Sequence, residues 1–497
     1  MAINTTIKSI QDIMRKDVGV DGDAQRIGQL GWMLFLKIFD DQEKEAEVFS
    51  DDYESPLPEE LRWRNWASDA EGITGDELKD FVDNRLFPGL QNLQARGDDY
   101  RGVVIRNVFD DAFNYMKSGQ LMRQVINKLE EGINFNKSSD RHELGEVYEK
   151  ILKDLQSAGN AGEFYTPRAV TEFMVNRVDP GLEEKVMDPA CGTGGFLTCT
   201  IDHKRKHYVK TPEDEKILQR SIHGIEKKHL PHMLATTNMI LHGMEVPDTI
   251  RHDNALARPL TSWGPKDRVD VIVANPPFGG MEEDGIETNF PQQFRTRETA
   301  DLFMTLFIHL LKPGGRAAVV LPDGFLFGEG MKTRLKEKLL DECNLHTIVR
   351  LPNGVFNPYT GIKTNLLFFT KGRSTEAVWY YEHPYPDGYK SYSKTKPMRF
   401  EEFQTEIAWW GSESDGFAAR QETQHAWKVP VEEIKSRDYN LDIKNPHVEQ
   451  ETNRDPEELL TRYDQQQSEI QEIRDKLKGI LADALNGTTE PEITKHK

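Results

Sequence analysis

The feature that most restricts the fold is an alternation of short β-rich runs with helical stretches between residues 159 and 372. Apolar, β-favouring residues predict strands at 185–187, 221–225, 269–274, 316–321, 347–351 and 365–370. The segment 301–311 instead has helical spacing, with one apolar face formed by Leu302, Phe303, Leu306 and Leu310. Strands that alternate with helices predict a doubly wound α/β fold with a mostly parallel sheet. Ligands bind at the carboxyl ends of the strands in such sheets, so we look for candidate site residues there.

The first candidate site follows the predicted strand at 185–187. The sequence continues from Asp188 through Gly192-Thr193-Gly194-Gly195 into an expected helix. Glycines let a backbone approach a ligand closely, and a helix N-terminus offers free N–H groups to an anion. A nicotinamide-dinucleotide site would prefer Gly-x-Gly-x-x-Gly directly after the strand. Asp188 could accept the ammonium of an amino-acid moiety such as methionine, whereas it would repel a pyrophosphate.

Two further acidic residues follow later strands. Glu226 ends the strand-like run from Ile222, at a position suited to hydrogen-bonding ribose hydroxyls. Asp253 comes next and could reach the adenine of a bound cofactor. Each acid taken singly is as well explained by a helix cap or a solvated loop. Their order after successive strands favours a binding site.

The tetrapeptide Asn275-Pro276-Pro277-Phe278 follows the predicted strand at 269–274. Consecutive prolines hold the backbone extended and remove N–H donors, which leaves carbonyl acceptors at the edge of the sheet. The Asn275 side-chain oxygen and the Pro276 carbonyl could accept both hydrogens of an aromatic exocyclic amine, and Phe278 could stack on an extruded base. As a bare string, the tetrapeptide could also be an ordinary turn.

The segment Glu163-Phe164-Tyr165-Thr166-Pro167-Arg168 lies upstream of these motifs. Thr166 has the character of a helix N-cap and Pro167 that of a first helical residue. We therefore expect a helix that begins at Pro167 and packs near the sheet.

The regions on either side have no catalytic pattern. The first ~155 residues have helical spacing, with Thr5 or Thr6 as a cap, and predict a packing and docking domain. The aromatic residues of 373–445 could touch nucleic acid, but we favour the packing of a small satellite region. The basic run at 203–207 predicts a solvated helix face. From residue 456, apolar residues spaced by threes and fours indicate a seam that either folds back or pairs with a partner helix.

Composition limits the class of protein. The 497 residues, 37% of them hydrophobic, predict about two or three domains. No apolar run approaches the roughly 18 to 20 residues of a membrane span, and the N-terminus lacks a signal-peptide core, so we expect a soluble cytoplasmic protein. The three cysteines lack metal-site or disulfide spacing. A net charge of -20 argues against a protein that grips a polyanion over its whole surface, though a partner could supply part of the grip.

The order of these motifs resembles the modification (M) subunit of type I restriction-modification enzymes. The resemblance rests on four stretches in chain order: Glu163 to Arg168, Asp188 to Phe196, Ile225-Glu226 and Asn275 to Phe278. It covers residues 144–372 well and both ends less specifically. It implies an S-adenosylmethionine-dependent, Rossmann-like methyltransferase fold with a helical N-terminal domain and a C-terminal helix.

The resemblance also implies function. The family methylates adenine N6 in double-stranded DNA, with the target chosen by a specificity (S) subunit, a second M subunit as partner, and restriction (R) subunits added for cleavage. By motif, Glu163 to Arg168, Thr193 to Gly195 and Glu226 would bind S-adenosylmethionine, and Asn275 to Phe278 would form the catalytic loop. We expect a helical domain at 1–155, a catalytic domain at 156–445 and a tail at 446–497 that contacts the S subunit.

Two other functions fit part of the pattern. Asn-Pro-Pro before an aromatic residue also occurs in enzymes that methylate protein glutamine amides, because a planar amide nitrogen poses the same chemical problem. Chain length, the N-terminal region and Phe rather than Tyr at 278 argue against this substrate. A helical scaffold with a degenerate core is the second alternative, and intact Asp188, Gly192, Gly194 and Asn275 argue against it.

Overall fold

The computed structural model describes residues 3–135, 145, 148, 166–357, 360–393, 395–447 and 456–485. The chain divides into two compact units, Met1–Lys444 and Asn445–Lys497, each described here by itself. Glu163, Phe164 and Tyr165, which the sequence assigns to the cofactor site, lie outside the described residues.

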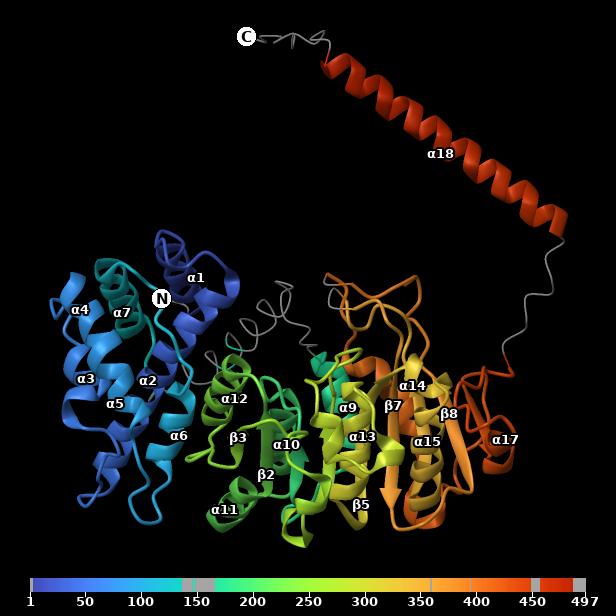
Figure 1. The fold of residues 1–497 in the computed structure, drawn as a ribbon, viewed down its shortest axis with the longest axis horizontal. Coiled ribbons are helices and arrows are strands. Elements are labelled where there is room, and N and C mark those ends of the chain that lie inside the picture. Colours follow the sequence, from blue (N-terminus) through green and yellow to red (C-terminus); the bar gives the residue numbers. More distant parts are fainter. Residues whose placement is uncertain are drawn as a thin grey trace. The chain divides into compact units, whose positions relative to one another are not determined.

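Helices form the N-terminal part of the first unit, as expected (Figure 1). They are α1 (Ile3–Met14), α2 (Asp23–Phe49), α3 (Trp63–Trp66), α4 (Gly75–Phe81), α5 (Phe87–Gln91), α6 (Arg101–Phe109) and α7 (Gly119–Gly132), with short helices at Glu59–Leu61 and Val82–Leu86. The predicted cap at Thr5 or Thr6 is wrong, because α1 already begins at Ile3. Thr6 is buried, and it packs so closely on α7 that a Cβ at Gly132 would meet its side chain at 2.4 Å.

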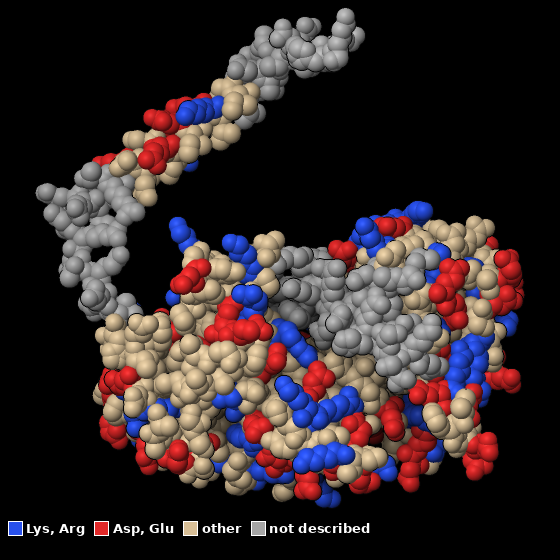
Figure 2. Space-filling view, turned by 180° about the vertical axis from the view of Figure 1, so that it is seen from behind, with Lys and Arg blue, Asp and Glu red and all other residues tan. Residues whose placement is uncertain are grey.

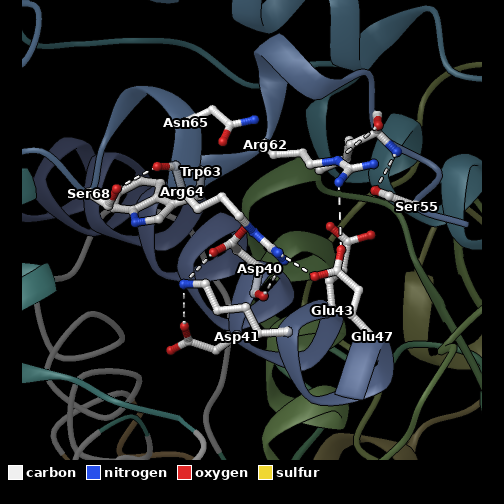
Figure 3. Close-up of polar contacts among 12 residues, drawn as sticks. Asp40, Asp41, Glu43, Glu47, Ser55, Arg62, Trp63, Arg64, Asn65 and Ser68 are labelled. Carbon is white, nitrogen blue, oxygen red and sulfur yellow. Dashed lines mark hydrogen bonds and ion pairs between the residues drawn. The ribbon is translucent and has the colours of Figure 1, made fainter. Parts of the chain in front are cut away.

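Helix α2 buries charges as well as apolar residues (Figure 3). Asp40 is completely buried, and its carboxylate lies 2.7 Å from Arg64 Nε and 2.7 Å from Lys44 Nζ. Its neighbour Asp41 is paired with the buried Lys37, whose Nζ lies 2.9 Å from the Asp41 carboxylate. Buried carboxylates are tolerated when such partners offset the loss of hydration. This cluster therefore fastens α3 to α2.

A nine-stranded sheet forms the remainder of the first unit, in the order β3-β2-β1-β4-β5-β7-β6-β8-β9. Strands β1 to β5 pair in parallel, β7 lies antiparallel between β5 and β6, and β9 is antiparallel to β8. The expected mostly parallel α/β sheet is confirmed. The strands are β1 (Val186–Asp188), β2 (Ile222–Glu226), β3 (Ile250–His252), β4 (Val269–Ala274), β5 (Leu311–Pro322), β6 (Cys343–Arg350), β7 (Thr364–Lys371), β8 (Ala377–Glu382) and β9 (Ala426–Pro430).

Helices cover both faces of this sheet, because successive side chains of a strand point to opposite faces. In β5, Ala318 and Val320 join the core that includes α9, whereas Ala317 and Val319 join the core with α13 and α15. The long helices are α9 (Arg168–Val178), α10 (Gly195–His207), α11 (Pro212–Ser221), α12 (His229–Leu241), α13 (Thr299–Leu310) and α15 (Met331–Glu342). Shorter helices are α14 (Asp323–Phe327), α16 (Gln404–Trp409), α17 (Val431–Ser436) and single turns at Leu260–Ser262, Pro265–Asp267, Ile286–Asn289, Gln292–Phe294, Phe400–Phe403 and Glu413–Asp415.

Helix α12 joins the N-terminal helices to the sheet. Its Met233 and Leu234 belong to the same apolar core as α2 and α6, while Ala235 and Met239 pack toward the sheet (Figure 1). The N-terminal helices therefore pack directly on the helix that follows β2.

The aromatic segment after residue 373 belongs to the main sheet. Tyr380 of β8 is buried and stacks on Trp427 of β9 at a centroid distance of 5.3 Å. The expectation that these aromatics serve packing is confirmed, but the satellite region is wrong, because β8 pairs with β6. Local sequence could not reveal this pairing, since the two strands come together only in the folded sheet.

The basic run at 203–207 ends α10 and is only partly solvated. Lys204 is completely buried, and its Nζ donates to the carbonyl oxygen of Glu184 at 2.7 Å and to Ser221 Oγ at 2.7 Å. Arg205 pairs with Glu215. Much of the run therefore fastens α10 to its neighbours, and the predicted solvated face is only partly correct.

The second unit contains α18 (Pro456–Leu485). Its apolar seam is exposed at Tyr463, Ile470, Ile473, Leu477 and Ile480. Among the described residues, no helix combines the length and the apolar character needed to cross a membrane.

Candidate active site

A cavity of about 370 Å³ opens at the carboxyl ends of β1 to β4. Because these strands are parallel, the residues that follow them meet at one edge of the sheet: Asp188, Glu226, Asp253 and Asn275 all line the cavity. The strand order reverses here, since β2 and β3 lie on one side of β1 and β4 lies on the other. Such a switch point is the place where open α/β sheets bind ligands.

The turn after β1 is built to approach a ligand. The Gly192 N–H donates to Glu226 Oε2 at 2.9 Å, which fastens the turn to the end of β2. Gly194 has a φ of 83°, a backbone conformation that strains other residues, so the turn requires glycine here. Helix α10 then begins at Gly195, as predicted, with its first N–H groups near the cavity.

Asp188 is an unusual buried carboxyl. It is 2% exposed and accepts a hydrogen bond from the Ala190 N–H at 3.1 Å. Burial, with a smaller contribution from the nearby Glu226 carboxylate, raises the pKa of Asp188 to about 8. Among the described residues, no Lys or Arg pairs with it. A cation in the cavity would stabilise its charged form.

Asn275 begins the loop after β4. Its Nδ2 donates to Thr166 Oγ1 at 2.8 Å, and its Oδ1 is buried without a hydrogen-bond partner among the described residues. The predicted cap at Thr166 is wrong: α9 begins at Arg168 with Pro167 as its N-cap residue, and no side chain caps it. The Thr166 hydroxyl contacts Asn275, 109 residues away, and does not bond the first turn of its own helix.

The other residues of the tetrapeptide lie differently. Pro277 lines the cavity, whereas Phe278 is 6% exposed and does not. The Phe278 ring packs edge-on against Phe356, with a centroid distance of 6.2 Å. Phe278 is thus a core residue in this conformation, and a base could stack on it only after the loop had moved.

The loop after Phe278 brings in a residue that the sequence did not single out. The buried Glu282 lines the cavity, and its carboxylate lies 3.1 Å from Lys227 Nζ. It also accepts from Asn254 Nδ2 at 3.4 Å and from Thr299 Oγ1 at 3.5 Å. Glu282 therefore links the loop after β4 to the residues that follow Glu226 and Asp253.

Two protein-family models together match nearly the whole chain. The model described as N-6 DNA Methylase matches residues 139–455, and the HsdM N-terminal domain matches residues 3–129. The type I restriction enzyme EcoEI methylase subunit of Escherichia coli is 65% identical over 98% of this chain and 99% of its own length.

The chain belongs to the methylase subunits of type I restriction enzymes.

Solved structures agree with this assignment. The modification subunit ascribed to a type I restriction enzyme of Vibrio vulnificus has a TM-score of 0.80 and 44% identity, over 90% of this chain and 97% of its own. A chain from a study of complex assembly and conformational transition of the type I R-M system has a TM-score of 0.79 and 36% identity, over 99% of both chains. The family and the methyltransferase fold expected from the motifs are thereby confirmed.

The cavity of this methylase subunit brings together most of the predicted site residues. Those that line it are Thr166, Asp188, Gly192, Thr193, Gly195, Glu226, Asp253, Asn275 and Pro277. Pro167, Arg168, Gly194, Pro276 and Phe278 do not line it. Arg168 instead contacts α10, with Nη1 at 3.0 Å from Thr198 Oγ1 and Nη2 at 2.7 Å from Asp202.

The structure adds cavity residues of two kinds. Pro189, Ala190 and Cys191 lie inside the predicted turn, and Lys227 and Lys228 directly follow Glu226, so their positions were implicit in the motifs. Thr299 and Phe303 come from the first turns of α13, where no motif marks them. Only the packing of α13 against the sheet brings them to the site.

Proposed function

We propose that this methylase subunit binds S-adenosylmethionine in the cavity and transfers its methyl group to N6 of an adenine in double-stranded DNA. The observation that carries the proposal is the Oδ1 of Asn275 at the cavity wall, which is buried and has no hydrogen-bond partner in the described part of the chain. A buried acceptor without a partner costs free energy, and it is retained where a ligand completes its hydrogen bonding.

The charged groups of the cavity suit the proposed cofactor. The Asp188 carboxyl, without a basic partner among the described residues, would accept the ammonium group. The N-terminus of α10 favours a carboxylate, and Glu226 and Asp253 would accept hydrogen bonds from the ribose and the adenine. Together with Glu282, four acidic side chains line the cavity, and they disfavour the pyrophosphate of a dinucleotide.

The residues of the loop after β4 would hold the target amine. The cofactor supplies an electrophilic methyl group, whose carbon–sulfur bond breaks as the bond to N6 forms. The N6 lone pair is delocalised into the purine ring. Asn275 Oδ1 and the Pro276 carbonyl would accept the two N6 hydrogens and favour the pyramidal nitrogen that attacks. Phe278 would stack on the extruded base once the loop has moved.

We further propose that DNA is held and read together with other subunits. The net charge of -20 argues against DNA binding over the whole surface, and on the face shown in Figure 2 acidic and basic side chains are interspersed. An S subunit would select the target, a second M subunit would complete the clamp, and R subunits would add cleavage. In this arrangement residues 1–155 clamp DNA or dock subunits, residues 156–445 catalyse, and residues 446–497 contact the S subunit.

The main test is methyl transfer from tritiated S-adenosylmethionine. We expect label on DNA, as N6-methyladenine, and not on a protein extract, with activity that is weak or absent until an S subunit is added. Label on cytosine would contradict the base assignment, and label on protein would contradict the substrate.

The tail is tested separately. Ile473→Asp places a charge in the exposed seam of α18, and Ser468→Asp places the same charge on the opposite face of the helix. We expect only the first variant to lose co-purification with the S subunit, while both bind S-adenosylmethionine normally. Equal retention of the S subunit by both variants would exclude the seam as the contact.

A further inference from the structure

The side-chain amide of Asn275 is held at one end only. Its Nδ2 donates to Thr166 Oγ1 at 2.8 Å, while its Oδ1 is buried and has no hydrogen-bond partner among the described residues. Both side chains line the cavity. The amide is thus fastened by its donor end, and its acceptor end is left for a ligand.

The direction of this amide matters for the proposed reaction. A primary amide has a donor end and an acceptor end of almost the same shape, and half a turn about the last side-chain bond exchanges them. Only the oxygen can accept a hydrogen from N6 of adenine. With the amide reversed, N–H groups would face N–H groups, and the amine would lose one of its two acceptors.

We propose that Thr166 is the positioning residue that fixes the direction of the Asn275 amide, an inference that rests on the proposed function. By accepting from Nδ2, the hydroxyl holds Oδ1 toward the base. Thr166 would act through Asn275 and need not touch the target base itself.

The residues that follow Thr166 leave its hydroxyl available for the contact with Asn275. The following Pro167 confines Thr166 to extended backbone and is itself the N-cap residue of α9, so the Thr166 hydroxyl is not used to cap the helix. Arg168, the first residue of α9, is pinned to Thr198 and Asp202 of α10. The contacts of Arg168 therefore hold the start of α9 in place, with Thr166 beside Asn275 at the end of β4.

A hydroxyl can also donate, so its own proton decides which way the amide faces. If Thr166 donated to Asn275, the reversed amide would be favoured. An acceptor presented by the bound cofactor would take the Thr166 proton and leave only lone pairs for Asn275. Cofactor binding would then favour the productive amide direction, and base capture would strengthen when the cavity is filled.

The first experiment compares Thr166→Val with Thr166→Ser in the assembled methyltransferase. At saturating S-adenosylmethionine we expect Thr166→Val to lower kcat by about 10- to 100-fold, and Thr166→Ser, which keeps the hydroxyl, to stay within about threefold of wild type. The dissociation constant of the cofactor, measured by calorimetry, should rise by no more than about tenfold, as for one lost hydrogen bond. An unchanged kcat for Thr166→Val would overturn the proposal.

The second experiment replaces the Asn275 amide with a group whose two ends are equivalent, so that its orientation no longer matters. Asn275→Asp has two acceptor oxygens, so rotating its carboxylate changes nothing. With 2-aminopurine beside the target adenine, where its fluorescence reports extrusion of that adenine, we expect Thr166→Val to weaken base capture when residue 275 is Asn and much less when it is Asp. Capture should also rise with S-adenosylhomocysteine in wild type and not in Thr166→Val. An equal loss in both backgrounds would overturn the proposal.

Two controls separate the possible failures. Thr200→Val removes a completely buried hydroxyl, which among the described residues bonds only the Phe196 carbonyl within α10, and should leave kcat near wild type. If wild type methylates no DNA adenine, the proposed function fails. If wild type does so and Thr166→Val matches it, this inference alone fails.

Discussion

Two buried carboxyl groups in this methylase subunit have opposite surroundings. Asp40 in α2 and Asp188 at the end of β1 are 0% and 2% exposed. Asp40 lies 2.7 Å from both Arg64 and Lys44, so the chain supplies its counter-charges. Asp188 accepts a hydrogen bond from the Ala190 N–H, and the charged side chain that acts on it is the acidic Glu226, which raises its pKa further.

The two buried carboxyl groups therefore have different roles: Asp40 stabilises the fold, whereas Asp188 is available to a ligand. A buried charge that is paired within the chain holds two elements together, as Asp40 does for α2 and α3 (Figure 3). A buried carboxyl without such a partner makes the empty protein less stable in its charged form and leaves that charge for a ligand. Asn275 Oδ1 is likewise buried without a hydrogen-bond partner among the described residues, so it is left to accept a hydrogen bond from a ligand.

The largest effect is expected at Asn275, whose buried side-chain oxygen is the hydrogen-bond acceptor in this comparison. Asn275→Ala should lower kcat by at least about 1000-fold, because it removes an acceptor aimed at the reacting amine. The dissociation constant of S-adenosylmethionine should change by no more than about threefold, since the contact is to the base. Transfer assays and calorimetry provide the two values. A collapse of cofactor binding would show that the role given to Asn275 is wrong.

The next effect tests the paired region. Arg64→Met leaves the buried Asp40 with Lys44 alone and should lower the free energy of unfolding by roughly 3 kcal/mol. Arg62→Met is the matched control: Arg62 lies 3.6 Å from the partly exposed Glu47, so its loss leaves no fully buried carboxylate with fewer partners and should cost less than about 1 kcal/mol. Urea denaturation measures both. If Arg64→Met also altered cofactor affinity, the cluster would not be purely structural.

A smaller effect is expected at Asp188. Asp188→Asn keeps the shape but removes the charge, and should weaken S-adenosylmethionine binding about 10- to 100-fold. At saturating cofactor its kcat should fall much less. Calorimetry and saturation kinetics separate the two effects. A loss confined to kcat would exclude Asp188 as the partner of the ammonium.

The last prediction is a pH dependence, whose effect is small for each pH unit. Because the folded pKa of Asp188 is about 8 and its ordinary value is 3.8, the folded protein keeps this proton over a range where the unfolded chain loses it. The stability that Asp188 contributes without cofactor should fall as pH rises from 4 to 8 and level off above that.

Cofactor affinity should change in the opposite direction. It should rise with pH toward about 8, by at most about tenfold per pH unit, because the charged carboxylate binds the ammonium. The comparison is between wild type and Asp188→Asn, so that titration of the cofactor cancels. Parallel pH profiles for the two proteins would contradict the raised pKa.

Local pattern predicted the elements that carry strong periodicity. The strand at 269–274 and the start of α10 at Gly195 were found from β-rich composition and from a glycine turn. Strands β8 and β9 were missed, because aromatic-rich segments become strands only when a neighbour pairs with them.

The site was predicted as a set of motifs and less well as a set of contacts. Thr166 was predicted as a helix cap from its place before a proline, and it contacts Asn275 instead. Phe278 was predicted as a stacking surface, and it is covered by Phe356. Glu282 carries no motif signal, because its partners come from three other segments of the chain.

The sequence by itself determined the chemistry of this protein: acidic residues after successive strands, a glycine turn that opens a helix, and an asparagine before two prolines. These depend on backbone conformation and residue type, which act over a few neighbours. The tertiary structure alone decided which groups are left unpaired. Asp40 has Lys44 four residues on in its own helix, but only the packing of α3 against α2 adds Arg64, while the switch point of the sheet leaves Asp188 open to a cavity. Whether a buried charge serves structure or function depends on partners that are distant along the chain.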